Sequence, residues 1–252
     1  MIHSGLVSVT FTRLPPEEVV RLVTLAGLEA IEWHGLAHVP HGDTDAARRV
    51  ARLTIDAGLR VAAYGSYYHV GEPNGFRFDQ VVETAALLGA PTIRVWAGHR
   101  PSAQADGTYR EKVVSESRHL ADMAAAEGMT ISYEYHGDSL TDTDASALQL
   151  LREVNHPAVR SYWQPHLNDT PEQLLTGLRD VLPWLSNVHV FHWHPGTERK
   201  PLAEGADQWM QYLRTVSAGG GDHSAMIEFV MHDSTDTFLQ DAVTLKTWLS
   251  SI

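Results

Sequence analysis

Short apolar segments alternate along the chain with longer segments in which apolar residues recur at the spacing of an α-helix. This pair of segments repeats eight times. Each short segment is rich in β-branched or aromatic residues and is bounded by Gly, Pro or polar residues, a pattern typical of β-strands. Strands separated by helices pair in parallel, because a parallel pair needs a long crossover connection. The predicted strands are LVSVTF (6–11), EAIEW (29–33), RVAAY (60–64), TIRVW (92–96), TISYE (130–134), RSYWQ (160–164), NVHVF (187–191) and AMIEF (225–229).

The segments of helical period carry start and stop signals. The first opens with Pro15, Pro16 and two acidic residues and closes on Gly27, as helix termini prefer. Thr170 before Pro171 has the pattern of an N-cap followed by proline at the first helical position. The predicted helices cover 15–27, 43–58, 78–90, 106–128, 142–154, 170–182, 206–219 and 234–249.

Eight strand–helix units in 252 residues predict an α/β protein that forms one (β/α)₈ TIM barrel, a single domain over residues 1–252. An open sheet that binds a dinucleotide would favour a glycine fingerprint after the first strand. The run after Phe11 is TRLPPEE, which contains no glycine. The closed barrel is therefore the preferred fold.

The charge balance and the absence of cysteine exclude several classes of function. A net charge of −12 argues against nucleic acid or an anionic membrane as a partner, since both need clustered Lys and Arg. The chain has no cysteine, which excludes disulfides, thiol nucleophiles and zinc–thiolate sites. No apolar run reaches the ~18 residues of a transmembrane helix, and the N-terminus lacks a signal-peptide pattern. We expect a cytoplasmic enzyme.

Polar side chains fall at the ends of the last four predicted strands: Glu134, Gln164, His189 and Glu228. Strand ends of a barrel face one shared mouth, and the alternation of side chains along each strand lets all four point into it. Glutamates in apolar strands are costly to bury unless they are paired or bind a metal. Two carboxylates, an amide and one imidazole suit a hard or borderline divalent ion. We expect Mn²⁺, with Mg²⁺, Co²⁺ and Zn²⁺ as alternatives.

Other polar and aromatic side chains near strand ends are candidates for substrate binding. Aromatic rings offer flat apolar faces, and imidazole and guanidinium groups hydrogen-bond hydroxyl or carboxylate groups. His192 faces the mouth only if the strand at 187–191 ends before it. The candidates are Glu32, His34, Tyr64, Trp96, His136, His166, His192 and Arg199.

Several segments in order along the chain resemble the sugar phosphate isomerase/epimerase family, the xylose-isomerase-like TIM barrels. The resemblance covers nearly the full length. The segments that carry it are EAIEWHG (29–35), VAAYGSYYHVG (61–71), TIRVWAG (92–98), SYEYHGDSLTDT (132–143), SYWQPH (161–166), NVHVFHWH (187–194) and MIEFV (226–230).

The resemblance implies a role for each residue of the predicted metal site. In that family a Glu, an Asp, a His and a Glu on strands five to eight hold a divalent metal, and these positions are Glu134, Gln164, His189 and Glu228 here. In the ketose epimerases of the family the two glutamates also move the substrate proton. Gln164 departs from the pattern, because an amide keeps an oxygen ligand but removes one negative charge. The barrels of this family often pair, so a homodimer is one expected assembly.

We therefore predict a metal-dependent sugar isomerase or epimerase that moves a proton next to a carbonyl through a metal-stabilised enediolate. Glu134 and Glu228 are the predicted acid/base pair, and the partner is a small sugar or keto-sugar. One alternative is a metal-assisted lyase or dehydratase, deglycosidase-like, acting on a keto-sugar. Another is a metal-free sugar-binding protein, which follows if Gln164 abolishes metal binding. An endonuclease would need a basic groove, which the net charge disfavours.

Overall fold

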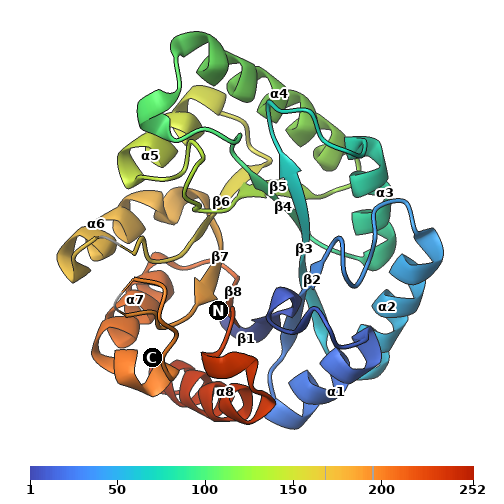
Figure 1. Cartoon of the computed structure of the whole chain (residues 1–252), viewed down its shortest axis with the longest axis vertical. Helices are drawn as coiled ribbons and strands as arrows, with labels where there is room; N and C mark the ends of the chain where they lie inside the picture. The colour runs from blue at the N-terminus through green and yellow to red at the C-terminus, as the bar shows by residue number, and fades with distance from the viewer. Residues whose placement is uncertain (168, 195) are drawn as a thin grey trace.

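Eight parallel strands close into a barrel in the order β1 to β8 in the computed structural model, which describes residues 1–252 except 168 and 195 (Figure 1). The closed (β/α)₈ barrel predicted from the sequence is confirmed. The strands are β1 (Ile2–Val7), β2 (Ala30–His34), β3 (Arg60–His69), β4 (Thr92–Trp96), β5 (Thr130–Tyr133), β6 (Val159–Trp163), β7 (Leu185–Val190) and β8 (His223–Ile227).

The helices form a ring around the barrel, one after each strand (Figure 1). At α6, Thr170 accepts a hydrogen bond from the Gln173 backbone N–H, and Gln173 accepts one from the Thr170 N–H in return, so the predicted N-cap is confirmed. The helices are α1 (Pro16–Ala26), α2 (Thr44–Asp56), α3 (Phe78–Leu88), α4 (Gly107–Ala126), α5 (Asp144–Val154), α6 (Pro171–Val181), α7 (Ala206–Gly219) and α8 (Thr235–Leu249).

The first strand lies earlier in the chain than its sequence predicts. Residues Ser8–Phe11 form a 3₁₀ turn, η1, so the predicted strand at 6–11 is wrong. β8 pairs with β1 from Ile2 to Leu6, and this pairing fixes the strand before the β-branched residues that follow it. The buried Thr10 hydroxyl donates to the Val7 carbonyl at 2.8 Å and stabilises the turn instead. The other predicted strands begin within two residues of the observed ones, and β3 extends to His69.

Towards the carboxyl ends of the strands, a small apolar layer inside the barrel is followed by a charged layer. Val7, Ala30, Tyr162 and Met226 belong to a buried cluster separate from the main core. Gly5 makes room for this layer, because a Cβ there would lie 2.8 Å from the Met226 side chain and from the Ala30 carbonyl oxygen. Strand alternation places the polar residues of the next layer on the same inner face.

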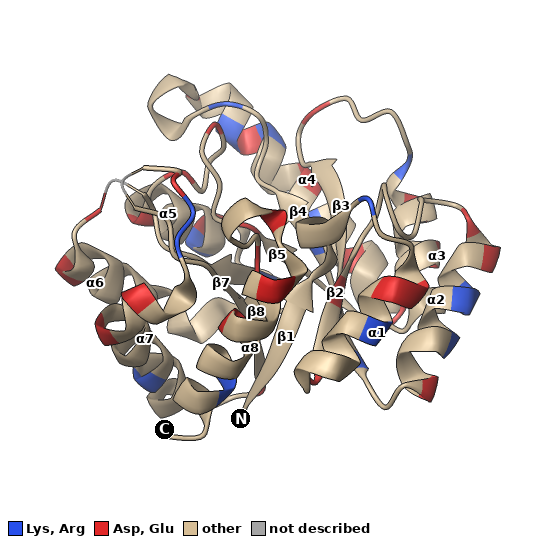
Figure 2. Cartoon of the chain, turned by 60° about the horizontal axis from the view of Figure 1, so that its bottom comes forward, with Lys and Arg blue, Asp and Glu red and all other residues tan. Residues whose placement is uncertain are grey.

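Charged residues are interspersed over the outer helices and loops (Figure 2). Positive and negative positions alternate along several helices, and Arg21 and Glu18 on α1 form one such pair. Among the helices of the described residues, none is long and apolar enough to span a bilayer.

Candidate metal and substrate site

The predicted metal ligands meet at the carboxyl end of the barrel. Glu134, Gln164 and Glu228 each directly follow a strand, and His189 lies within β7. The Glu134 backbone N–H donates to the Val95 carbonyl at 3.0 Å and the Glu228 N–H donates to the Val190 carbonyl at 3.0 Å. These bonds continue the sheet pairing by one residue and so fix both glutamates at the rim.

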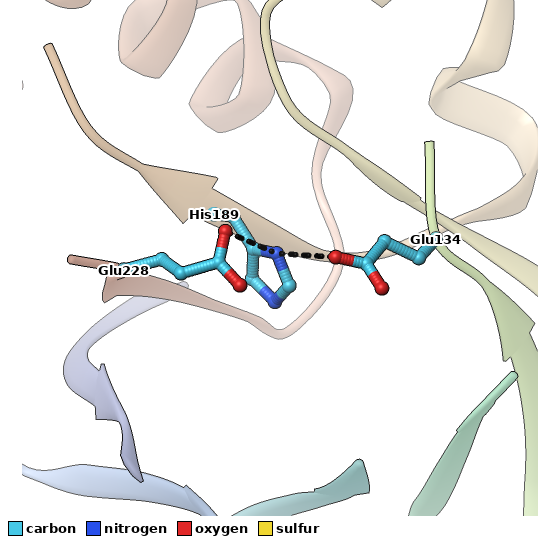
Figure 3. Close-up of side chains that lie close together, drawn as sticks. All are labelled: Glu134, His189 and Glu228. Atoms are coloured by element: carbon cyan, nitrogen blue, oxygen red, sulfur yellow. Dashed lines mark ion pairs between the residues drawn. The ribbon is translucent and has the colours of Figure 1, made fainter. Parts of the chain in front are cut away.

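His189 lies between the two carboxylates (Figure 3). Its Nδ1 atom is 3.4 Å from Oε2 of Glu228 and 3.7 Å from Oε1 of Glu134. One ligand atom from each of the three residues lies within 4.8 Å of the others, and all three residues are buried. Such a convergence of two carboxylates on one imidazole can hold a cation.

Gln164 contacts the same imidazole nitrogen. Its Oε1 accepts a hydrogen bond from Nδ1 of His189 at 2.7 Å, and its Nε2 donates to the Tyr135 carbonyl at 2.7 Å. The second bond fixes which end of the amide is oxygen, because a carbonyl can only accept. The amide oxygen therefore faces the space between Glu134, His189 and Glu228.

Arg94 lies beneath this cluster and is the residue that the sequence reasoning missed. It is 1% exposed. Its Nε donates to Oε1 of Glu32 at 2.6 Å, and its other end pairs with Glu134. An arginine in the middle of the apolar strand TIRVW was the signal that could have revealed it, since a buried guanidinium needs a carboxylate partner.

Glu32 connects Arg94 to His189. It is fully buried, and its Oε2 lies 3.4 Å from Nε2 of His189. Burial alone would raise the pKa of Glu32, but the charges of Arg94 and His189 lower it to about 2. Glu32 is therefore a permanent anion at neutral pH.

His189 is cationic in the metal-free protein. Burial alone would lower its pKa, but Glu228 and Glu32 raise it to about 9. The same two glutamates, with Tyr67, raise the pKa of Arg94 against the opposing effect of burial. A metal bound at Nδ1 would have to displace the proton there, because an imidazole binds metal only through an unprotonated nitrogen.

The cavity above the cluster has a volume of about 490 Å³, within the range of small-molecule sites. Trp96 forms one wall, with its indole N–H donating to Glu134 and its ring stacked on His136 at 4.6 Å. Tyr67 lies over Arg94 at 4.7 Å and has a left-handed φ of 56°, a strained conformation of the kind found at functional sites. The lining also includes Arg94, Glu134, Gln164, His166, Trp193 and Glu228.

The structure separates the predicted substrate-binding residues into two groups. Trp96, His136 and His166 line the cavity. The others lie elsewhere: Glu32 below the cluster, Tyr64 bonded to the Val39 carbonyl, His34 accepting from the Leu36 and Ala37 N–H groups, Arg199 paired with Asp233, and His192 beside a neighbouring cavity. Roles for all eight stay predictions.

The residues present fit a divalent cation. Nδ1 of His189 faces the two carboxylates and the amide oxygen, while its Nε2 faces the Glu32 carboxylate, the arrangement usual for a metal-bound histidine. Glu134 and Glu228 together carry the two negative charges that neutralise a divalent ion. Oxygen-rich ligand sets of this kind suit Mg²⁺ or Mn²⁺.

Comparison with known proteins places this architecture in a family. The family model described as xylose isomerase-like TIM barrel matches residues 20–241. The chain belongs to the xylose isomerase-like TIM barrel family. The resemblance noted in the sequence is thus confirmed.

The chain is similar to a dehydratase and, in structure, to an epimerase. The chain is 23% identical over 248 residues to 3-dehydroshikimate dehydratase of Bacillus anthracis, covering 87% of each protein. The structure named as the probable 3-DHS dehydratase AsbF of B. anthracis superposes with a TM-score of 0.82 at 21% identity, over 98% of this chain and 99% of that one. The 3-keto-D-glucoside 4-epimerase of E. coli superposes with a TM-score of 0.73 at 18% identity, over 100% of both chains. At these identities the structural likeness shows the fold.

Proposed function

We propose that this chain is an enzyme that moves a proton next to the carbonyl group of a small hydroxylated ketone. The observation that supports this most directly is the pair of buried carboxylates, Glu134 and Glu228, on either side of His189 at the base of a cavity (Figure 3). Carbonyl-adjacent proton transfer needs a base, an acid and a way to stabilise negative charge on the carbonyl oxygen. All three are within reach of the cavity.

The two carboxylates differ in their surroundings, and this suggests a division of labour. Arg94 and the Trp96 indole N–H both donate to Oε2 of Glu134, so that carboxylate is held as an anion. For the Glu228 carboxylate, the single ion pair within the described part of the chain is to His189. We assign Glu228 as the base that removes the proton and, once protonated, as the acid that delivers it to the leaving hydroxyl group, so that water departs. Glu134 is the fixed anion that orients the site.

A bound divalent metal, held by Glu134, Gln164, His189 and Glu228, would polarise the substrate carbonyl as a Lewis acid. Arg94 keeps Glu134 in place through its buried ion pair. Trp96 and Tyr67 cover the cavity wall and exclude water from the reacting carbon. His136 and His166 line the rim and are placed to bind substrate hydroxyl groups.

Loss of water from a hydroxylated ketone is the outcome that we favour, and epimerisation is the second candidate. Dehydration is supported by the match to a named dehydratase over most of both chains. Epimerisation would instead require Glu134, on the other side of His189 from Glu228 (Figure 3), to act as the acid that returns the proton to the carbon. Both reactions begin with the same proton abstraction. Action on a sugar-like small molecule in the cytoplasm is part of this proposal.

Nuclear magnetic resonance in D₂O tests the common step. The protein, loaded with Mg²⁺ for the spectra, is incubated with 3-dehydroshikimate or with D-fructose. Dehydration gives a conjugated product with new ultraviolet absorbance, whereas epimerisation gives an isomer that carries deuterium at the reacting carbon. If neither ketone, nor a 3-keto-glucoside added as a third substrate, loses or exchanges its carbonyl-adjacent proton with Mg²⁺, Mn²⁺ or Co²⁺ present, the proposal is wrong.

A further inference from the structure

A second cavity of about 610 Å³ adjoins the 490 Å³ cavity of the candidate site. It extends over the segments after β6 and β7 and the start of α7. The boundary between the two cavities is formed by six residues that line both: Pro165, His166, Leu167, Asp169, Phe191 and Trp193. The two cavities are therefore neighbours at the same end of the barrel.

The inner wall of the second cavity is aromatic and rigid. Trp209 and Tyr212 of α7 are 2% and 3% exposed, and both rings pack against Trp163. The Trp209 indole N–H donates to the Phe191 carbonyl at 2.9 Å, which fixes the ring relative to the strand end. The wall that they form is apolar and rigid, and it suits contact with the C–H groups of a ring-shaped ligand.

The outer wall carries acidic groups. Asp169, Glu204 and Asp207 line it, and no Lys or Arg belongs to the described lining residues. Carboxylates accept hydrogen bonds from hydroxyl groups but repel phosphate and carboxylate groups. The charge of the cavity thus disfavours an anionic ligand and is compatible with an uncharged hydroxylated one.

Trp193, on the boundary, holds an unused hydrogen-bond donor. Its Nε1 atom is buried and has no partner among the described residues. The ring is fixed between Phe191 and Phe229, with centroid distances of 4.4 and 5.8 Å. A buried donor without a partner is costly, and a ligand hydroxyl that spans the two cavities would satisfy it.

We propose that the second cavity is a binding subsite for an uncharged, hydroxylated ring joined to the ketone that reacts in the first. The substrate class is then a two-ring compound such as a glycoside, rather than a free monocyclic ketone. This inference rests on the proposed function of the first cavity for the identity of the reacting half. The second half is selected by the aromatic wall and the acidic rim.

Equilibrium binding tests the subsite without turnover. Isothermal titration calorimetry on the full chain compares D-glucose with cellobiose, the uncharged disaccharide of the same ring, and with cellobiuronic acid, its carboxylated form. We expect cellobiose to bind at least tenfold more tightly than glucose and at least tenfold more tightly than the acid. Equal affinity for glucose and cellobiose, or no binding of either, overturns the subsite.

Two variants of α7 localise the effect. Gln208 is exposed and lines the second cavity, so the Gln208→Trp side chain should fill that cavity. Gln211 is also exposed, one turn further along α7, but does not line the cavity. Gln211→Trp is therefore the matched control. We expect Gln208→Trp to abolish the preference for cellobiose while glucose affinity stays within twofold, and Gln211→Trp to keep the preference. A preference that survives in Gln208→Trp overturns the inference. Cellobiose preference without proton exchange on any ketone would reject the proposed function and leave the subsite standing.

Discussion

The charged side chains at the barrel mouth form one coupled group. Glu32, Glu134 and Glu228 are three anions, while Arg94 and protonated His189 are two cations, which leaves one net negative charge in the metal-free protein. When His189 is neutral and a divalent ion is bound, the charges of these residues and of the ion sum to zero. The amide at Gln164 is consistent with this balance, because an aspartate there would leave one charge in excess.

Arg94 should be the residue whose loss destabilises the barrel most. It joins two buried carboxylates, Glu32 and Glu134, and removal of one partner from a buried ion pair costs about 3–5 kcal/mol. We expect Arg94→Met to lower the free energy of unfolding by that amount in urea titrations. The double variant Arg94→Met with Glu32→Gln should recover part of this loss. The control Arg48→Met, at an exposed position, should change the free energy of unfolding by less than ~0.5 kcal/mol. A near-native Arg94→Met protein would contradict the buried network.

Glu228 should be required for turnover but not for folding. Its carboxylate pairs with His189 alone among the described residues, and Glu228→Gln keeps the size of the side chain while removing the base. Loss of a general base typically lowers the rate about 10²- to 10⁴-fold. We expect a drop of that size in proton exchange from the ketone that proves to be a substrate, with an unchanged circular dichroism spectrum. The exposed Glu127→Gln is the control, and near-native exchange in Glu228→Gln would rule out the assigned role.

At the scale of elements, the sequence predicts the ends of a strand where neighbouring residues in the chain limit it. It does not predict them where pairing with another strand limits it. β4 matches its predicted bounds because Pro91 and the residues after Trp96 limit it on both sides. β1 does not, because its register with β8 outweighs the β-branched residues beyond Val7. The four predicted ligands reach one mouth as alternation implied, whereas Arg94 could be recognised as their partner only after β2, β4 and β5 were placed side by side.

One buried carboxyl on α8 should make stability depend on pH. Asp241 accepts a hydrogen bond from the Leu202 N–H at 2.9 Å, is 2% exposed, and has its pKa raised to about 6 by burial. A carboxyl whose folded pKa lies above its unfolded pKa stabilises the fold below the unfolded value and loses that contribution as pH rises through the folded value. The free energy of unfolding should therefore fall between about pH 4 and pH 7 by about 1–2 kcal/mol.

Asp241→Asn isolates this effect. The amide keeps an oxygen for the Leu202 N–H and removes the charge, so the variant should be more stable than the natural chain at pH 7.5 and equal to it near pH 4. Urea unfolding at both values measures the difference. Asp236→Asn, exposed in the first turn of α8, should show no such pH dependence, and a gain at pH 7.5 in both variants would remove the assignment to Asp241.

At the scale of the whole molecule, closure of the barrel brings together residues that no local pattern connects. Glu32 of β2 and His189 of β7 are 157 positions apart in the chain and 3.4 Å apart in space. The sequence predicted the order of strands and the shared mouth, but the second cavity depends on the segments after β6 and β7 and the first turn of α7. Those segments have no regular pattern, so only the folded chain shows that they enclose a space.

Metal binding should stabilise the entire barrel. A ligand at one hundred times its dissociation constant adds about 2.7 kcal/mol to the free energy of unfolding, and 1 kcal/mol shifts the melting temperature of a chain of this size by about 2–4 °C. Saturating Mn²⁺ or Mg²⁺ should therefore raise the melting temperature by about 5–10 °C in differential scanning fluorimetry, reversibly with EDTA. The double variant Glu134→Gln and Glu228→Gln should lose the shift, because it removes both carboxylates of the Glu134–His189–Glu228 cluster. An equal shift in the natural chain and in this variant would place the metal elsewhere. No shift in the natural chain would contradict metal binding at this site.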